Sequence, residues 1–198
     1  FEVNDEYRRT LDLQDLTSSY RDKFGRFDTR YSNSKTTSFI SQPFGSTEYD
    51  LFHFETLDDG ANTSRKVKIS IANLRRSNDP LNPYGTFDVY VRNYYDTDLA
   101  SEILEQYNGC NLNPADENYI AAKIGDYKVY YNFDAVSDDE KRIVSSGKYE
   151  NRSKYVRIVM NGSVTNGNIP KSTLPFGFRG IPTLVTNDTL ADEPTGVE

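Results

Sequence analysis

Two short segments in the first half of the chain alternate strictly between apolar and polar residues. Residues 66–71 read Lys-Val-Lys-Ile-Ser-Ile, and residues 86–92 read Thr-Phe-Asp-Val-Tyr-Val-Arg. A period of two places every second side chain on the same face of a strand, which is typical of a sheet with one buried face. The alternation therefore predicts two half-buried strands, whose inward residues are Val67, Ile69, Ile71, Phe87, Val89 and Val91.

Three further strands are predicted at residues 49–57, 127–133 and 155–160, where apolar and aromatic residues gather between polar turns. The first of these is followed by Asp-Asp-Gly at residues 58–60, a typical turn sequence. Residues 32–35, Ser-Asn-Ser-Lys, are expected to form a loop.

A helix is predicted over residues 99–107. Its apolar residues recur at every fourth position, as one face of a helix requires, and they are Leu99, Ile103 and Tyr107. Asp96 and Asp98 precede this stripe and would cap the helix, because their carboxylates accept hydrogen bonds from its first N–H groups.

A second helix is predicted over residues 114–124, with Pro114 in its first turn and Gly125 ending it. A strand, two helices and another strand form a crossover unit, which would bring the strands at 86–92 and 127–133 into parallel register. The sequence therefore predicts an α/β (α+β) fold, a mixed β-sheet with flanking helices that includes a strand-helix-helix-strand crossover.

The length of 198 residues suits one domain with small attachments. We expect a polar N-terminal segment over residues 1–35, an α/β domain over residues 36–186 and a polar C-terminal tail over residues 187–198. The chain starts at Phe1 instead of methionine and ends in a polar stretch, so we expect it to be a piece of a longer protein.

Charge and composition disfavour several classes of partner. The formal net charge of -7 argues against nucleic acid and against anionic membrane surfaces. No apolar run approaches the roughly 20 residues of a membrane span. The single cysteine, Cys110, cannot form an internal disulfide, and with one histidine in the chain it cannot build a zinc site.

The residues that bear chemistry are few. His53, the only histidine, lies between two phenylalanines and is interpreted as a half-covered strand residue; Cys110 is interpreted as a buried or idle thiol. Asp96 and Asp98 could act as a carboxylate pair in glycoside cleavage or hold calcium, but capping fits their spacing better. We therefore expect no enzyme activity, no cofactor and no metal.

Tyrosine is abundant, with 15 copies. Tyr90 and Tyr130, which the strand patterns place on outward faces, suit a protein interface, where tyrosine is enriched. Sheet propensity alone explains them equally well. Composition and motifs leave two functional classes open beside a structural role, a carbohydrate-binding or adhesin-like module and, with less support, a carboxylate-based hydrolase.

Five stretches in order resemble the tail sheath proteins of contractile bacteriophages, of the T4-like or phiKZ-like large myoviruses. These stretches are residues 82–92 (NPYGTFDVYVR), 95–98 with 103–107 (YDTD and ILEQY), 111–114 (NLNP), 118–120 with 124–126 (NYI and IGD), and 174–180 (LPFGFRG). The resemblance as a whole extends over roughly residues 40–182.

The resemblance implies a structural role without catalysis or cofactor. Sheath subunits form stacked hexameric or helical rings around a tail tube, in the virion, after assembly in the cytoplasm of the bacterial host. Their contraction drives the tube through the host envelope. The partners implied are neighbouring sheath subunits, with the tube and baseplate contacted by parts outside this chain. We expect the chain by itself to be monomeric.

Two sets of residues follow from the resemblance and from the charge pattern. The structural motif residues are Pro83, Tyr84, Gly85, Thr86, Phe87, Pro175, Phe176, Gly177, Phe178, Arg179 and Gly180. Gly85 and Gly177 among them are expected to occupy turns with positive φ. The candidate intersubunit contacts are charged residues flanking the predicted elements, namely Arg75, Arg76, Asp138, Asp139, Glu140, Arg142, Arg152 and Lys154.

Overall fold

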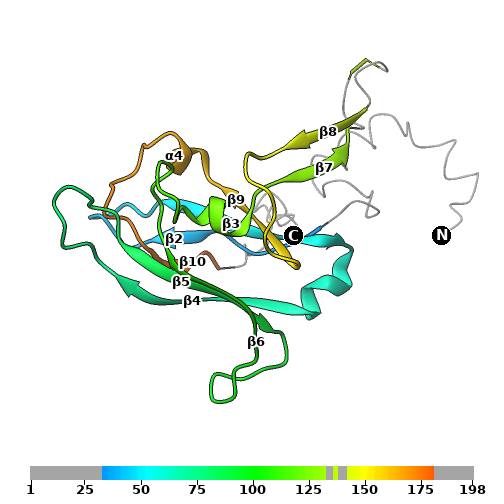
Figure 1. The fold of residues 1–198 in the computed structure, drawn as a ribbon, viewed down its shortest axis with the longest axis horizontal. Coiled ribbons are helices and arrows are strands. Elements are labelled where there is room, and N and C mark those ends of the chain that lie inside the picture. Colours follow the sequence, from blue (N-terminus) through cyan, green and yellow to red (C-terminus); the bar gives the residue numbers. More distant parts are fainter. Residues whose placement is uncertain (1–32, 133–135, 138–141, 181–198) are drawn as a thin grey trace, which may run out of the picture.

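The computed structural model describes residues 33–132, 136–137 and 142–180 (Figure 1). Strands dominate the described residues, and helices are few. The strands are β1 (Asn33–Lys35), β2 (Phe39–Ser41), β3 (Asp50–Asp59), β4 (Val67–Arg75), β5 (Thr86–Asn93), β6 (Ile103–Cys110), β7 (Lys128–Tyr131), β8 (Ile143–Ser146), β9 (Val156–Met160) and β10 (Pro175–Phe178). The helices are the 3-10 helix η2 (Ala61–Arg65) and the short α-helices α3 (Ile120–Ile124) and α4 (Gly162–Thr165).

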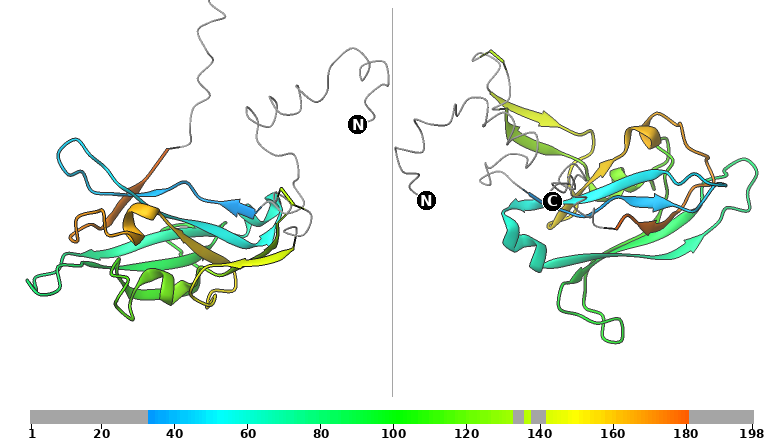
Figure 2. Two further views of the ribbon diagram at one scale, coloured as in Figure 1. Left: turned by 90° about the horizontal axis from the view of Figure 1, so that it is seen from above. Right: turned by 180° about the vertical axis from the view of Figure 1, so that it is seen from behind.

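These strands form two main sheets and one separate hairpin. In the first sheet the long strand β3 pairs with β9 along one edge and with β1 and β2 along the other, and β10 joins the outer edge of β2. The second sheet is the meander β4-β5-β6, and β7 with β8 forms the hairpin. Figures 1 and 2 show the two sheets lying across each other, with the β7-β8 hairpin projecting beyond them.

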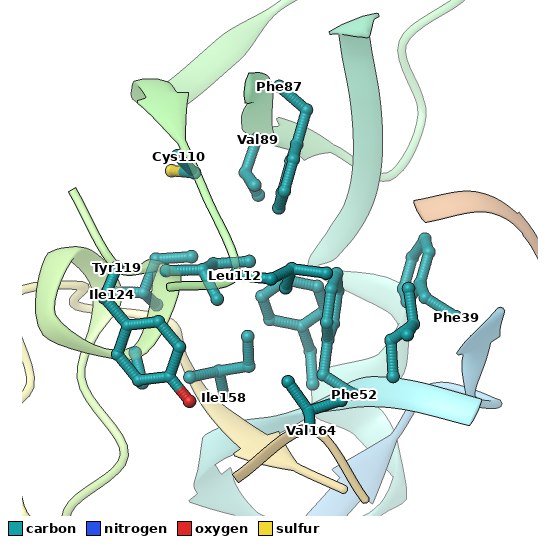
Figure 3. Close-up of a cluster of buried hydrophobic side chains, with 14 of the residues drawn as sticks. Phe39, Phe52, Phe87, Val89, Cys110, Leu112, Tyr119, Ile124, Ile158 and Val164 are labelled. Atoms are coloured by element: carbon teal, nitrogen blue, oxygen red, sulfur yellow. The ribbon is translucent and has the colours of Figure 1, made fainter. Parts of the chain in front are cut away.

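The core lies between the two sheets. Phe52 of β3 and Phe87 of β5 stack across the interface, with ring centroids 6.3 Å apart and an interplanar angle of 12°. Phe39 stacks on the other side of Phe52 at 5.3 Å. Helix α3 closes one side of this core through Ile120 and Ile124, both fully buried (Figure 3). Burial of such side chains contributes about 1.5–3 kcal/mol each, so this aromatic stack is a main source of stability.

The broad fold class and the strand predictions are confirmed. The structure combines strands with a few helices in several sheets, as an α+β fold does. The strands predicted at 49–57, 66–71, 86–92 and 155–160 correspond to β3, β4, β5 and β9. Val67, Ile69 and Ile71 pack against the core, and the inward residues of β5 are fully buried. Strand β7 matches the start of the segment 127–133, whose last residue lies outside the described residues.

The helix predicted over residues 99–107 is wrong. Residues 103–110 form strand β6, which pairs antiparallel with β5. The same segment also carries a period of two, with Glu105 and Tyr107 half-buried between exposed neighbours, so it satisfies strand spacing as well as helix spacing. The unpaired edge of β5 supplies backbone partners, and this long-range pairing outweighs local helix propensity.

The second predicted helix is shorter than residues 114–124, and the crossover is wrong. Asn113 and Asp116 accept hydrogen bonds from backbone N–H groups two residues ahead, which favours turns, so α3 starts only at Ile120 and ends before Gly125 as predicted. Strands β5 and β7 belong to different sheets. All paired strands among the described residues are antiparallel. The one parallel backbone contact within these residues is an isolated bridge between Asn111 and Tyr119.

The sheet includes residues that the sequence assigned to a loop. Asn33–Lys35 pairs with β3, and the Asn33 side chain donates to the Thr56 carbonyl at 3.0 Å. The domain therefore contains residues 33–35, although the predicted boundary follows residue 35. The remaining residues of the N-terminal segment, residues 181–186 and the tail 187–198 lie outside the described residues.

The expectation of positive φ at Gly85 and Gly177 is wrong, because neither is among the glycines with that conformation. Gly85 is instead required by a close approach. A Cβ at Gly85 would lie 2.6 Å from the Arg75 carbonyl oxygen and 2.8 Å from Leu174 Cδ2, whereas a Cβ at Gly177 would meet only Ile40, at 3.8 Å.

This difference predicts unequal effects of two similar substitutions on the free energy of unfolding. Gly85→Ala is expected to lower the free energy of unfolding by about 1–3 kcal/mol, because backbone and a packed leucine must move to admit the methyl group. Gly177→Ala is expected to change it by less than about 0.5 kcal/mol. Chemical unfolding followed by circular dichroism measures both. Equal effects at the two positions would contradict the close approach as the reason for Gly85.

Candidate interaction surfaces

The two isolated candidates for catalysis are engaged in the fold. His53 is half-buried on β3, and its Nε2 lies 3.6 Å from Glu55 Oε1. Cys110 is fully buried, its Sγ donates to the Tyr107 carbonyl, and burial raises the pKa of its thiol to about 11. The interpretations of His53 as a half-covered strand residue and of Cys110 as a buried thiol are therefore confirmed.

Asp96 and Asp98 form an ion-pair cluster around Arg92 instead of capping a helix. The Arg92 guanidinium donates to both Asp96 oxygens, at 2.8 and 2.9 Å, and to Asp98 Oδ1 at 2.8 Å. Lys68 Nζ lies 2.5 Å from Asp96 Oδ1, and the Glu102 N–H donates to Asp96 Oδ2 at 2.8 Å. The Arg92 and Asp96 side chains are 9% and 1% exposed, so this cluster is a buried polar joint between β4, β5 and the 94–102 loop.

The cluster disfavours one catalytic role for Asp96, that of a general acid. The hydrogen bonds from Arg92, and next to them those from Lys68 and the Glu102 backbone, hold the pKa of Asp96 well below its usual range. A general acid in glycoside cleavage needs a raised pKa, so Asp96 is unsuited to that role. Asp98 is 95% exposed and shares the same guanidinium. The pair therefore organises a loop.

A second charge cluster lies on the outer face of the first sheet. Glu55 of β3 accepts from Arg157 Nη2 on β9 and lies 3.8 Å from Lys128 Nζ on β7. The contact with His53 and the positive charges of Arg157 and Lys128 outweigh burial and lower the pKa of Glu55 to about 2. This cluster ties the base of the β7-β8 hairpin to the sheet.

The lowered pKa of Glu55 predicts an acid-dependent part of stability. Its folded pKa of about 2 lies below the usual 4.5, so its stabilisation is present above pH 4.5 and is lost as the pH falls toward 2. We expect a loss of about 3 kcal/mol over that window from this group. Glu55→Gln lacks the contribution at pH 5, and the difference in unfolding free energy between wild type and variant should shrink as the pH falls to about 2.5. A constant difference across this range would contradict the assignment.

Two of the structural motif residues contact residues that lie far from them in the sequence. Gly85 contacts Leu174, the residue before β10. Pro83, Tyr84 and Thr86 are half-buried, Phe87 and Pro175 are buried, and Phe176, Phe178, Arg179 and Gly180 are exposed. Arg179 pairs with Asp50 at 2.6 Å and with Glu48 at 3.7 Å, which ties the end of β10 to the start of β3.

The candidate contact charges lie on the surface but are not brought together. Arg75, Arg76, Arg142, Arg152 and Lys154 are all exposed, whereas Asp138, Asp139 and Glu140 lie outside the described residues. Figure 1 shows the end of β4 and the β7-β8 hairpin on opposite sides of the molecule. The described members of this set therefore do not form a single surface patch.

A groove that the sequence did not reveal lies beside the β7-β8 hairpin. It has a volume of about 570 Å³, and its lining includes Tyr127, Lys128, Val129, Tyr130, Ile143 and Arg157. Val129 and Ile143 are 57% and 71% exposed. The outward placement of Tyr130 was the one sequence feature that pointed to this groove. The other residues of the groove come from distant parts of the chain.

Among the described residues, no group of three or more histidine, cysteine, aspartate or glutamate side chains is placed to hold a metal ion. Within the same residues, no helix is long and apolar enough to cross a membrane. Comparisons with protein-family models, with curated proteins and with solved structures found no match for the chain.

Proposed function

We propose that this chain is part of a structural subunit of a contractile bacteriophage tail sheath. In this role it packs against neighbouring sheath subunits in helical or hexameric rings around the tail tube. It moves with them when the sheath shortens and drives the tube through the host envelope. The observation that carries the proposal is the ordered set of five sheath-like stretches, whose residues form the joints of this fold.

Three of these joints support the proposal in particular. Residues 86–92 of the first stretch lie in β5, and Gly85 of the same stretch contacts Leu174 of the stretch 174–180. The stretches 111–114 and 118–120 meet where the Asn111 N–H donates to the Asn118 carbonyl at 2.9 Å and the Ile120 N–H donates to the Asn111 carbonyl at 3.0 Å. The stretch 95–98 contributes the carboxylates around Arg92.

A contractile array needs subunits that keep their shape while their contacts change. Buried ion pairs and close backbone contacts hold separate elements of this chain in one arrangement. The exposed charges fit contacts that re-form after sliding, because a lone surface pair contributes only about 0–1 kcal/mol and can exchange partners readily. The side chains of His53, Cys110 and Asp96 each contact other parts of the fold, which also favours a structural role over catalysis.

The remaining parts of the proposal follow from the sheath role. The location is the virion, after assembly in the bacterial cytoplasm, and the partners are neighbouring sheath subunits, with tube and baseplate bound by other parts of the protein. Nucleic acid and membrane are not expected partners, and no cofactor is required.

Electron microscopy of the whole protein that contains this chain tests the proposal. Hollow, striated cylinders are the expected product; a protein that stays dispersed under all assembly conditions would contradict it. Reversing the charges of Arg75 and Arg76 together is expected to alter assembly or the salt sensitivity of contraction, while the melting temperature of the isolated chain stays nearly constant. Unchanged assembly and contraction at low and high salt would exclude these two arginines as contacts.

The groove beside the β7-β8 hairpin favours a second candidate, a carbohydrate-binding module. Tyr127 and Tyr130 lie in its lining together with Asn151 and Arg157, and aromatic residues with polar neighbours suit sugar rings. Thermal shift measurements with a panel of bacterial surface saccharides test this candidate. A ligand at 100 times its dissociation constant adds about 2.7 kcal/mol of stability, which is readily measured. No shift with any saccharide would remove it.

A further inference from the structure

The loop between β5 and β6, residues 94–102, is held firmly at its base by polar contacts. Besides its pairs with Asp96 and Asp98, Arg92 donates to the Thr97 carbonyl at 3.0 Å. The Asn93 N–H donates to the Glu102 carbonyl at 2.9 Å, which closes the base of the loop. The conformation of this loop therefore does not depend on burying its apolar side chains.

Apolar side chains stand exposed on this firmly held loop. Leu99 at the tip is fully exposed, at 102%, and Tyr95 is 76% exposed. Asp98 and Glu102 beside them are also exposed, so the tip joins an apolar side chain to negative charge. An exposed leucine that the fold does not need, on a loop with a fixed shape, suits contact with another molecule.

The groove beside the hairpin has residues that are chemically complementary to those of the loop. Val129 and Ile143 present exposed apolar surface in its lining. Lys128 lies in the same lining, where its Nζ is 3.8 Å from Glu55 Oε2 and 5.8 Å from the centroid of the Tyr130 ring. Its side chain is 31% exposed, so a carboxylate from outside can approach the exposed part of the ammonium. A volume of about 570 Å³ is ample for a leucine side chain and its neighbours.

The loop and the β7-β8 hairpin lie on opposite sides of the molecule. Figure 1 and the right view of Figure 2 show the 94–102 loop at the bottom and the β7-β8 hairpin at the top. Two complementary patches on different sides of one chain join copies head to tail, and such contacts build open helical arrays instead of closed dimers.

We propose that the 94–102 loop of one copy docks in the groove beside the β7-β8 hairpin of a second copy. Leu99 contacts Val129 and Ile143, and Asp98 lies beside Lys128. The inference rests on the proposed sheath function for its setting and names the surfaces that neighbouring subunits share. Because the contact is small, its dissociation constant in the isolated chain should be roughly millimolar, so the chain is monomeric at micromolar concentration.

Cysteine crosslinking tests this contact directly. The variant with Leu99→Cys and Ile143→Cys together is oxidised at the highest soluble concentration, with the buried Cys110 left in place. We expect a ladder of disulfide-linked dimers, trimers and longer chains, because each copy offers one loop and one groove. A mixture of the two single variants should stop at the dimer. Both substituted positions are exposed, so the melting temperatures should remain close to that of the wild type.

Leu81→Cys combined with Ile143→Cys is the matched control, because Leu81 is 94% exposed on a different loop. At least tenfold more ladder from the Leu99 pair than from the Leu81 pair supports the proposal. Equal yields from the two pairs, or dimers from Leu99→Cys alone, would overturn it, the latter because they indicate a symmetric contact.

The failure of this contact and the failure of the sheath function are distinguishable. Leu99→Ser in the whole protein should impair cylinder formation if both are right. Normal cylinders from this variant, together with an absent ladder, leave the sheath function standing and remove the contact. A specific ladder from a protein that never forms cylinders leaves the contact standing and removes the function.

Discussion

Phe87→Ala is expected to lower the free energy of unfolding by about 3–5 kcal/mol, the range typical of a phenylalanine deleted from a core. Phe87 is fully buried near the start of β5, and its ring stacks on Phe52 of the opposite sheet. The substitution removes the main aromatic contact between the two sheets and leaves a cavity that neither sheet can fill without separating from its own partners.

Urea unfolding followed by circular dichroism at several protein concentrations measures this loss. Phe176→Ala serves as the control, because Phe176 is 69% exposed on β10 and should change the unfolding free energy by less than about 0.5 kcal/mol. A loss at Phe87 no larger than that at Phe176 would show that the two sheets are not joined through this stack.

Strand β5 shows what the sequence could predict. Its alternation requires only that one face be buried, and the buried set Phe87, Val89 and Val91 follows directly from a period of two. The end of α3 at Gly125 was predictable for a similar reason, since a glycine after an apolar helical segment marks a stop.

The 94–110 region shows where such reasoning fails. Leu99, Ile103 and Tyr107 fit a helix, but Asp96 is drawn to Arg92 and Lys68, and residues 103–110 pair with β5. The partners of Asp96 and of residues 103–110 lie outside the 94–110 region, so no local sequence pattern records these contacts. The missing information was that Arg92 is buried although the strand pattern places it on the outward face. The loop that folds over Arg92 decides this burial.

The surface sites were harder still to predict. The groove is lined by residues of β1, β3, β7, β8 and β9 and of the segments beside them, which are distant from one another in the chain, and its tyrosines look like ordinary strand residues. The contact charges were recognised as exposed, but their distribution over different sides of the molecule depends on the packing of the sheets.

Gly125→Ala is expected to lower the free energy of unfolding by about 2–6 kcal/mol, from two effects that add. Gly125 has a φ of 107°, a conformation open essentially to glycine alone, which costs another residue about 1–3 kcal/mol. A Cβ there would also lie 2.3 Å from the Asn151 Cα and 2.6 Å from the Glu150 carbonyl oxygen, so packed backbone must move, at a cost of about 1–3 kcal/mol.

The second effect can be separated from the first with Gly167→Ala. Gly167 has a φ of 70°, but a Cβ there would meet nothing within 4 Å, so this variant reports the backbone conformation alone and should cost about 1–2 kcal/mol. Gly125 also joins three parts of the fold, since its N–H donates to Ala121 of α3 and its carbonyl accepts from Ile158 of β9, both at 2.9 Å. If Gly125→Ala costs no more than Gly167→Ala in denaturant unfolding, residues 150–151 do not press on Gly125, and the joint between α3, β9 and the segment leading to β7 is looser than the structure shows.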